Sequence, residues 1–308
     1  MPRQPAGRLR LPAGLIVVAR LIAASLGYLA VFSTASLVLF FTGSTVVPEA
    51  ARGTFGLLSL GVAEAAAIGM VLLLWRFVDG QPLVALGLEL QPAVRQWLRG
   101  AGVAGLMMGF IVLAWYTLVD GASWELNSDP LRASIVVLGG LAGFAIQGPA
   151  EEILFRGYIL EHVQAQWGLR WAVAVSAIAF ALFHALNPAF NPVALINLLL
   201  FGVATALYKV RVDQGQLWGV FGIHSVWNWL QQVVFGLPNS GILSTPDNAL
   251  FTVRPDTSLP EPIWGGGFGP EGTLAASLVL LALIGASLRQ PSPVKPVRSS
   301  RRPRTGRG

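Results

Sequence analysis

The sequence contains three short polar motifs whose residue types are those that hydrolytic enzymes use. The first is the acidic pair Glu151 and Glu152, with Arg156 four residues after the second acid. Residues four apart share one face of a helix, so Glu152 and Arg156 can form an ion pair. Glu151 lies about 100° round the helix from Glu152 and stays free to act as a base. The acids following Pro149 are equally typical of the first turn of a helix, and this alternative stays open.

The second motif places His184 four residues after Phe180 in a long uncharged stretch. A lone histidine on an apolar helix is more often a hydrogen-bonded core residue than a catalytic one. A turn predicted around Trp167 favours the catalytic role. Glu151 lies 16 residues before Trp167 and His184 lies 17 residues after it, so the two are level in an antiparallel helical hairpin. The spacing therefore predicts that Glu151 and His184 can meet.

The third motif places His224 and Asn228 four residues apart, one above the other on a helix face. Buried histidine and asparagine side chains often hold membrane helices together by hydrogen bonds. An imidazole and an amide on one face are also what a developing oxyanion needs. One further acid, Glu64, lies in an apolar stretch with no partner by spacing, and we interpret it as a structural or gating acid.

The composition shows what kind of element must position these side chains. The chain has 308 residues, of which 54% are hydrophobic and 12% are charged, whereas a soluble domain carries about 25% charged residues. The absence of cysteine excludes disulfides and thiolate metal sites. The net charge of +6 is explained by basic loops at one membrane face, and no nucleic-acid partner is predicted. The sequence therefore predicts an all-α, polytopic membrane protein.

Uncharged stretches of membrane-spanning length predict a bundle of about eight transmembrane helices, with the active-site cavity inside the bundle. The proline-rich segment Asn187–Pro192 divides one long stretch into two spans. The predicted spans are Leu21–Phe41, Gly53–Leu74, Gly100–Val119, Ala133–Ala150, the two halves of Trp171–Tyr208, Gln216–Phe235 and Thr273–Leu288.

An even number of spans puts both termini on one side, and the basic residues indicate which side. With both ends in the cytoplasm, 18 of the 21 Lys and Arg residues fall inside, and only Arg52, Arg132 and Arg254 fall outside. We expect one transmembrane domain over residues 1–288 and a basic, disordered cytoplasmic tail over 289–308. The predicted location is a plasma membrane, and the abundance of Ala, Gly, Leu and Arg suggests a bacterial one.

The depth of the site in the bilayer is not settled by spacing. With Trp167 at the inner surface, Glu151 and His184 lie about 24 Å up the hairpin. His224 then lies only about 10 Å from the inner end of its own span and does not reach them. Either the hairpin protrudes into the cytoplasm, or Pro149 starts a separate, tilted helix.

The three motifs together resemble those of the type II CAAX prenyl endopeptidases, also called the CPBP or Abi family of intramembrane proteases. The family pattern is Glu-Glu-x-x-x-Arg, then Phe-x-x-x-His, then His-x-x-x-Asn or Asp. The matching residues here are Glu151, Glu152, Arg156, Phe180, His184, His224 and Asn228. The resemblance covers about Ala133–Gln232, whereas the first three spans and the loop Gly236–Gly272 match nothing in the family pattern.

The resemblance implies a membrane endopeptidase with a polar cavity that opens toward the cytoplasm. Relatives trim prenylated proteins at a C-terminal CAAX sequence, and bacterial relatives are linked to bacteriocin self-immunity or peptide maturation. The expected partners are therefore the lipid bilayer and a membrane-associated protein or peptide substrate, prenylated or not.

Two mechanisms fit these residues. In the first, which we favour, no cofactor is required: Glu151 with His184 takes a proton from water, and His224 and Asn228 stabilise the oxyanion. In the second, Glu151, His184 and His224 hold a zinc ion that leaves one position for water.

Two other function classes remain open on the sequence alone. A non-catalytic immunity or scaffold protein would use the same polar residues to hold its helices together. A proton-coupled transporter would use Glu64 and Glu151 as a relay, although the two halves of the chain contain no inverted pair of broken helices.

Overall fold

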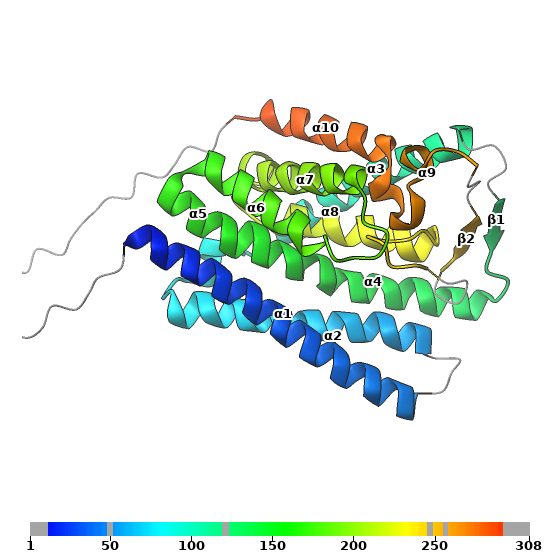
Figure 1. Ribbon diagram of the computed structural model, residues 1–308, viewed down its shortest axis with the longest axis horizontal. Coiled ribbons are helices and arrows are strands. Elements are labelled where there is room, and N and C mark those ends of the chain that lie inside the picture. Colours follow the sequence, from blue (N-terminus) through cyan, green and yellow to red (C-terminus); the bar gives the residue numbers. More distant parts are fainter. Residues whose placement is uncertain (1–11, 48–51, 119–122, 245–248, 255–257, 292–308) are drawn as a thin grey trace, which may run out of the picture.

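Helices make up most of the chain that the computed structural model describes, namely residues 12–47, 52–118, 123–244, 249–254 and 258–291 (Figure 1). The segment 1–11 and most of the predicted tail lie outside the described residues. The long helices are α1 (Ala13–Val46), α2 (Arg52–Leu73), α3 (Ala93–Leu118), α4 (Pro130–Glu152), α5 (Leu160–Trp167), α6 (Leu169–Phe183), α7 (Pro192–Leu207), α8 (Trp218–Trp229) and α10 (Leu274–Leu288). The predicted all-α membrane bundle is confirmed.

Several helices continue directly into wider π-helical turns. These turns are Leu74–Val78 after α2, Ile153–Ile159 between α4 and α5, Tyr208–Val212 after α7 and Leu230–Val234 after α8. Each predicted span overlaps one of the resulting continuous helices. Five stretches of the described chain are long and apolar enough to cross a membrane, while α6 and α10 are shorter apolar helices. The exact number of crossings therefore stays a prediction.

The site is built around one unusually long helix, in which α4, a π-turn and α5 run without a break over Pro130–Trp167. Its 38 residues extend for about 57 Å, nearly twice the thickness of a bilayer core. Pro149 lies inside α4, so the expectation that it starts a separate helix is wrong. Membrane helices tolerate an internal proline because neighbouring groups satisfy the freed backbone. The other alternative, that the hairpin protrudes into the cytoplasm, stays a prediction.

A tight reversal follows this helix and brings α6 back along it. Gly168 makes the turn with φ of 87°, a conformation that glycine adopts without strain. The predicted break after α6 is present: α6 ends at Phe183, and α7 begins at Pro192 with the Asn191 side chain accepting from the amide N–H of Ala194 at 2.9 Å. His184 is thus the first residue beyond α6.

Helix α8 packs between α3 and α4, and small residues make this close approach possible. A Cβ atom at Gly148 of α4 would lie 2.7 Å from the backbone nitrogen of Ser225 in α8. The two residues sit directly beside Gln147 and His224 in the sequence. Glycine at position 148 therefore lets the acidic pair of α4 reach the histidine of α8.

Short elements lie at one end of the bundle. The strands β1 (Ser123–Leu126) and β2 (Phe251–Arg254) form an antiparallel pair in which Ser123 faces Arg254. The helix α9 (Glu261–Trp264) and two 3-10 turns, Gly266–Phe268 and Pro270–Gly272, connect this end to α10. The sequence did not predict this strand pair. At the opposite end α1 begins and α10 ends, so the described chain enters and leaves the bundle on one side (Figure 1).

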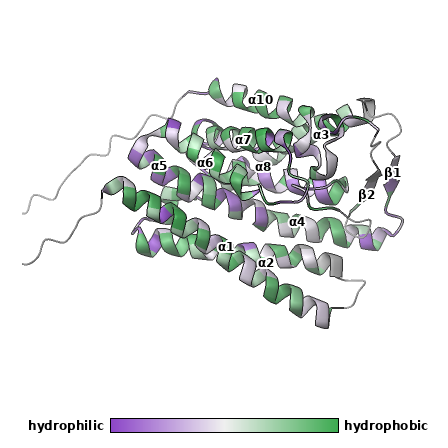
Figure 2. Ribbon diagram, in the orientation of Figure 1, coloured by the Kyte–Doolittle hydropathy of each residue, from purple (hydrophilic) through white to green (hydrophobic). Residues whose placement is uncertain are grey.

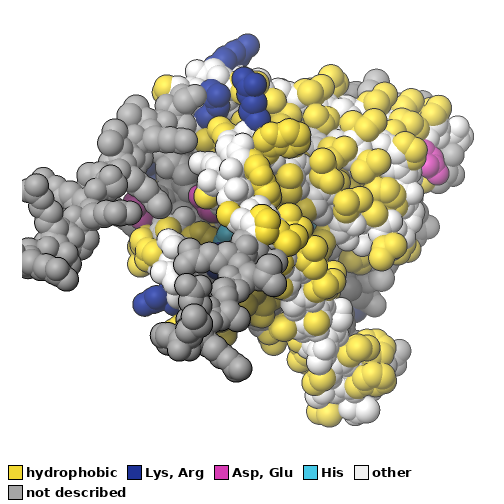
Figure 3. Space-filling view, turned by 60° about the vertical axis from the view of Figure 1, so that its left-hand side comes forward, with side chains coloured by type: hydrophobic (Ala, Val, Ile, Leu, Met, Phe, Trp, Pro, Cys, Tyr) yellow, Lys and Arg dark blue, Asp and Glu magenta, His cyan; other side chains and the backbone are white. Residues whose placement is uncertain are grey.

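The surface of the bundle is suited to lipid. Hydrophobic residues colour much of α1, α4, α7 and α10 (Figure 2), and large apolar side chains such as Phe40, Leu106 and Leu138 are more than half exposed. Hydrophobic side chains cover much of the face in Figure 3, whereas Lys and Arg side chains gather toward the end near the chain termini. The chain is an integral membrane protein.

Candidate active site

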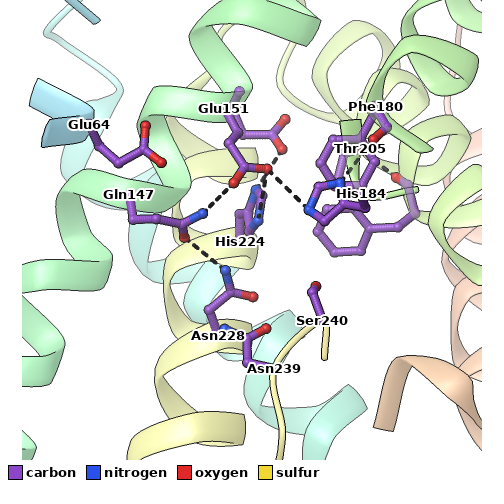
Figure 4. Close-up of polar contacts among 12 residues, drawn as sticks. Glu64, Gln147, Glu151, Phe180, His184, Thr205, His224, Asn228, Asn239 and Ser240 are labelled. Carbon is purple, nitrogen blue, oxygen red and sulfur yellow. Dashed lines mark hydrogen bonds and ion pairs between the residues drawn. The ribbon is translucent and has the colours of Figure 1, made fainter. Parts of the chain in front are cut away.

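Glu151 lies at the centre of a cluster of polar side chains from three helices (Figure 4). Its Oε2 atom is 3.8 Å from Nε2 of His184 and 3.9 Å from Nε2 of His224. Its Oε1 atom accepts a hydrogen bond from the side-chain amide of Gln147, one turn earlier on α4. Glu151 is 9% exposed, and its Oε2 atom is buried without a hydrogen-bond partner among the described residues.

The other nitrogen of each imidazole is already in use. Nδ1 of His184 lies 2.9 Å from the carbonyl oxygen of Phe180, and Nδ1 of His224 lies 2.8 Å from a carboxylate oxygen of Glu152. Since both oxygens accept, both Nδ1 atoms must donate, and in the neutral rings each Nε2 is an acceptor. Three acceptors thus face one another across gaps too long for a direct hydrogen bond, which is the setting for a bridging water.

Glu152 and Arg156 form a fully buried ion pair, with Nη1 of Arg156 3.0 Å from Oε1 of Glu152 and neither side chain exposed. The same Oε1 atom also accepts a hydrogen bond from Nδ1 of His224. Glu152 therefore orients a histidine in addition to being neutralised. The guanidinium carbon lies 4.4 Å from the centroid of the Phe180 ring, a distance at which a cation is attracted to an aromatic face.

Asn228 connects to Glu151 through an intermediate that the sequence analysis did not name. Its amide nitrogen donates to Oε1 of Gln147 at 2.8 Å, and the amide of Gln147 donates to Glu151. This chain of amides fixes the orientation of the carboxylate. Gln147 lies four residues before Glu151 in an otherwise uncharged span, and this spacing was the signal that could have found it.

Phe180, which the motif included without a role, packs against Arg156 of the ion pair and against both histidines. Its ring centroid is 4.7 Å from that of His184 and 6.0 Å from that of His224. It also stacks on Phe201 of α7 at 5.6 Å. Aromatic walls of this kind keep bulk water from the ion pair.

These side chains open into a cavity of about 350 Å³ within the bundle, a volume typical of a small ligand site. Its wall includes residues from α1, α2, α4, α6, α7 and α8, and also the loop after α8 that matched no pattern. Among the described residues that line it there is no Lys or Arg. The charges in the cavity wall are therefore carboxylates and histidines alone.

Glu271 is a further carboxylate in the cavity wall. Its carboxylate accepts from the backbone N–H of Ser240 at 2.7 Å, from the Ser240 hydroxyl at 3.0 Å and from the amide of Gln231 at 3.0 Å. Burial raises the pKa of the Glu271 carboxyl above its ordinary value. These bonds hold the segment around Ser240 against the mouth of the site.

The region that contains these residues matches a known protein family. Residues 133–230 match the family model described as "Type II CAAX prenyl endopeptidase Rce1-like". The resemblance predicted from the three motifs is confirmed. The match spans about a third of the chain, and all six predicted site residues fall within it. A comparison with curated proteins finds no match.

The Rce1-like region does not present a ready zinc site. Zinc bonds of about 2.0–2.2 Å would place the ligand atoms of a tetrahedral site about 3.3–3.6 Å apart, whereas Glu151 lies 3.8 and 3.9 Å from His184 and His224. Within the described residues, no three His, Asp or Glu side chains are arranged to hold a metal ion. The observed arrangement does not fit zinc, and the zinc alternative stays a prediction for experiment.

Proposed function

We propose that this protein is an intramembrane endopeptidase that hydrolyses a peptide bond of a membrane-associated protein or peptide. One observation carries the proposal: the Oε2 atom of Glu151 is buried without a hydrogen-bond partner and faces two imidazole acceptors. A stabilising role would pair this oxygen with a donor, because an unpaired buried charge is costly. A water molecule at this position can donate to Oε2 of Glu151 and to one of the two imidazoles, and the Rce1-like match supports this interpretation.

The proposed reaction begins with that water. Its oxygen attacks the scissile carbonyl carbon while its proton passes to Glu151, assisted by His184. The charge that develops on the carbonyl oxygen is met by the second amide N–H of Asn228, which Gln147 does not use. His224 contributes through Nε2 once it carries a proton, and the carboxylate of Glu152 at its Nδ1 compensates that charge.

The direct test is turnover of a peptide library by the purified protein in detergent, with and without a chelator. Matched library members carry or lack a prenyl group, which identifies the substrate class. We expect cleavage that continues in the chelator. Cleavage that stops on chelation and returns with zinc would overturn the cofactor-free mechanism, whereas the absence of any cleavage would overturn the proposed function.

Loss of the Asn228 amide is expected to slow the reaction without stopping it. Asn228→Ala should lower kcat by about 10²–10³-fold, the effect of removing one oxyanion donor, with little change in KM. Ser225→Ala is the control on the same helix, because the Ser225 hydroxyl is buried without a partner among the described residues. If Asn228 acted only by holding Gln147, then Gln147→Ala would cost as much as Asn228→Ala, and the oxyanion role would be rejected.

We also propose that both termini are cytoplasmic, in a bacterial plasma membrane. Arg156 and Lys209 are fully buried inside the bundle. They therefore do not belong to a loop and are left out of the count of basic loop residues. The remaining split is 16 basic residues inside against three outside, which still follows the positive-inside rule. A reporter fused after Leu288 should be active only if it is one that works in the cytoplasm. Activity of a periplasmic reporter at that position would reject this topology.

A further inference from the structure

Glu64 is a second buried carboxylate of the cavity, and the mechanism above does not use it. It lies on α2, is 4% exposed and lines the same cavity as Glu151 (Figure 4). Its Oε2 atom accepts a hydrogen bond from the hydroxyl of Tyr28 on α1, which is 2% exposed. The two carboxylates therefore face one shared cavity.

The surroundings of the two acids differ in a way that decides which one holds a proton. Glu151 accepts a hydrogen bond from the amide of Gln147 and has two imidazoles within 4 Å, either of which becomes a cation beside it on taking up a proton. Glu64 has a tyrosine hydroxyl, and no ion pair is present for it among the described residues. Two neighbouring carboxylates in a poorly solvated site cannot both be ionised at low cost. The negative charge therefore belongs on Glu151 and the proton on Glu64.

We propose that protonated Glu64 is the general acid of the site, which gives its proton to the leaving amine. The inference rests on the proposed peptidase function, in which the group that protonates the leaving amine has not been assigned. An amide nitrogen leaves as a neutral amine only if it gains a proton as the C–N bond breaks, and two carboxylic groups with separated proton affinities divide the roles of base and acid.

Every proton in the proposed catalytic cycle is accounted for. The attacking water gives one proton to Glu151 and forms the new C–O bond. Glu64 gives its proton to the nitrogen as the C–N bond breaks, which releases the amine and leaves Glu64 ionised. The proton held by Glu151 then returns to Glu64 through water in the cavity, and the net reaction consumes one water per peptide bond.

A structural role for the same pair is the competing explanation, since the Tyr28–Glu64 hydrogen bond also ties α1 to α2. Only Ala24, Tyr28 and Gly43 of α1 are buried in the described chain, and an ion pair between Arg20 and Asp79 at 3.0 Å also connects α1 to the turn after α2. The two roles differ in what they predict for the leaving group. A tie between helices matters equally for every substrate, whereas a general acid matters only when the leaving group needs a proton.

The test compares an amide substrate with an aryl ester of the same peptide, because a phenolate leaves without being protonated. Glu64→Gln keeps the size of the side chain and an oxygen for Tyr28. We expect it to lower kcat on the amide by about 10²-fold or more and kcat on the ester by less than about tenfold. Glu151→Gln should lose both activities, and Tyr28→Phe should lose less amide activity than Glu64→Gln.

Each remaining outcome rejects the inference. Full amide turnover by Glu64→Gln, or equal losses of turnover on amide and ester, would rule out the general-acid role. The proposed peptidase function would still hold, because the wild-type protein cleaves the amide. A second readout, the detergent melting temperature, identifies a variant that has merely lost its fold. If the wild-type protein cleaves neither substrate, then the proposed function fails and the inference fails with it.

Discussion

Glu151→Gln is expected to abolish peptide hydrolysis while the protein still inserts and folds. Glutamine has the same size, and its carbonyl oxygen can accept the hydrogen bond that Gln147 now donates to Oε1. Its amide nitrogen would face the Nε2 atoms of His184 and His224, which are acceptors. The variant thus keeps the hydrogen bond with Gln147 but loses the oxygen that takes a proton. We expect turnover to fall by about 10⁴-fold, the upper range for a general base.

The measurement is kcat on the best library peptide, and Glu89→Gln is the matched control. Glu89 is exposed and lies outside the cavity wall, so its loss of charge should leave turnover unchanged. Full turnover by Glu151→Gln would refute the role of Glu151 as the general base. Absence of turnover in the wild-type protein would instead favour a protein that acts by binding, such as an immunity factor or a scaffold, in which these polar residues hold the helices together.

The parts of this site that the sequence predicted are those set by local geometry. The pairing of Glu152 with Arg156 follows from a spacing of four on one helix. The meeting of Glu151 with His184 follows from counting residues on either side of the turn at Trp167. In both cases the chain between the partners is short or regular, so its path can be followed without knowing the rest of the bundle.

The parts that the sequence did not predict depend on how distant helices pack. His224 meets Glu152 across 72 positions, and Tyr28 meets Glu64 across 36. Nothing in the hydrophobic pattern specifies the lateral neighbours of a helix that is apolar all round. The depth problem had the same origin. Pro149 appeared to start a helix because its interior position in α4 depends on neighbours that satisfy the backbone.

Packing also explains why the loop after α8 became part of the site without any motif. Its residues Asn239 and Ser240 line the cavity. Glu271, far along the chain, holds them there by accepting hydrogen bonds from the backbone N–H and the hydroxyl of Ser240. A single glutamate in a loop rich in Gly and Pro has many possible partners. The hydrogen-bond partner of Glu271 is determined only by the packing of the whole bundle.

The second large effect is expected for Arg156→Ala, which should destabilise the fold as well as stop the reaction. The substitution leaves Glu152 as a buried charge without its cation, and neither side chain of the pair is exposed to solvent that would screen it. Breaking such a pair costs about 3–5 kcal/mol. We expect this loss in the free energy of unfolding in detergent, with Arg170→Ala, an exposed residue, as the control.

A double variant separates the stability of the pair from its function. Glu152→Gln combined with Arg156→Met removes both charges, and replacing a buried pair by neutral groups of similar volume often restores most of the lost stability. Activity should not return, because the glutamine no longer compensates the charge that His224 carries when it donates to the oxyanion. If the double variant recovers turnover together with stability, then Glu152 serves the fold alone. If Arg156→Ala is as stable as the wild type, then the buried pair does not hold the site together, and the orientation of His224 must come from the packing of Phe180 and Phe201 against its ring.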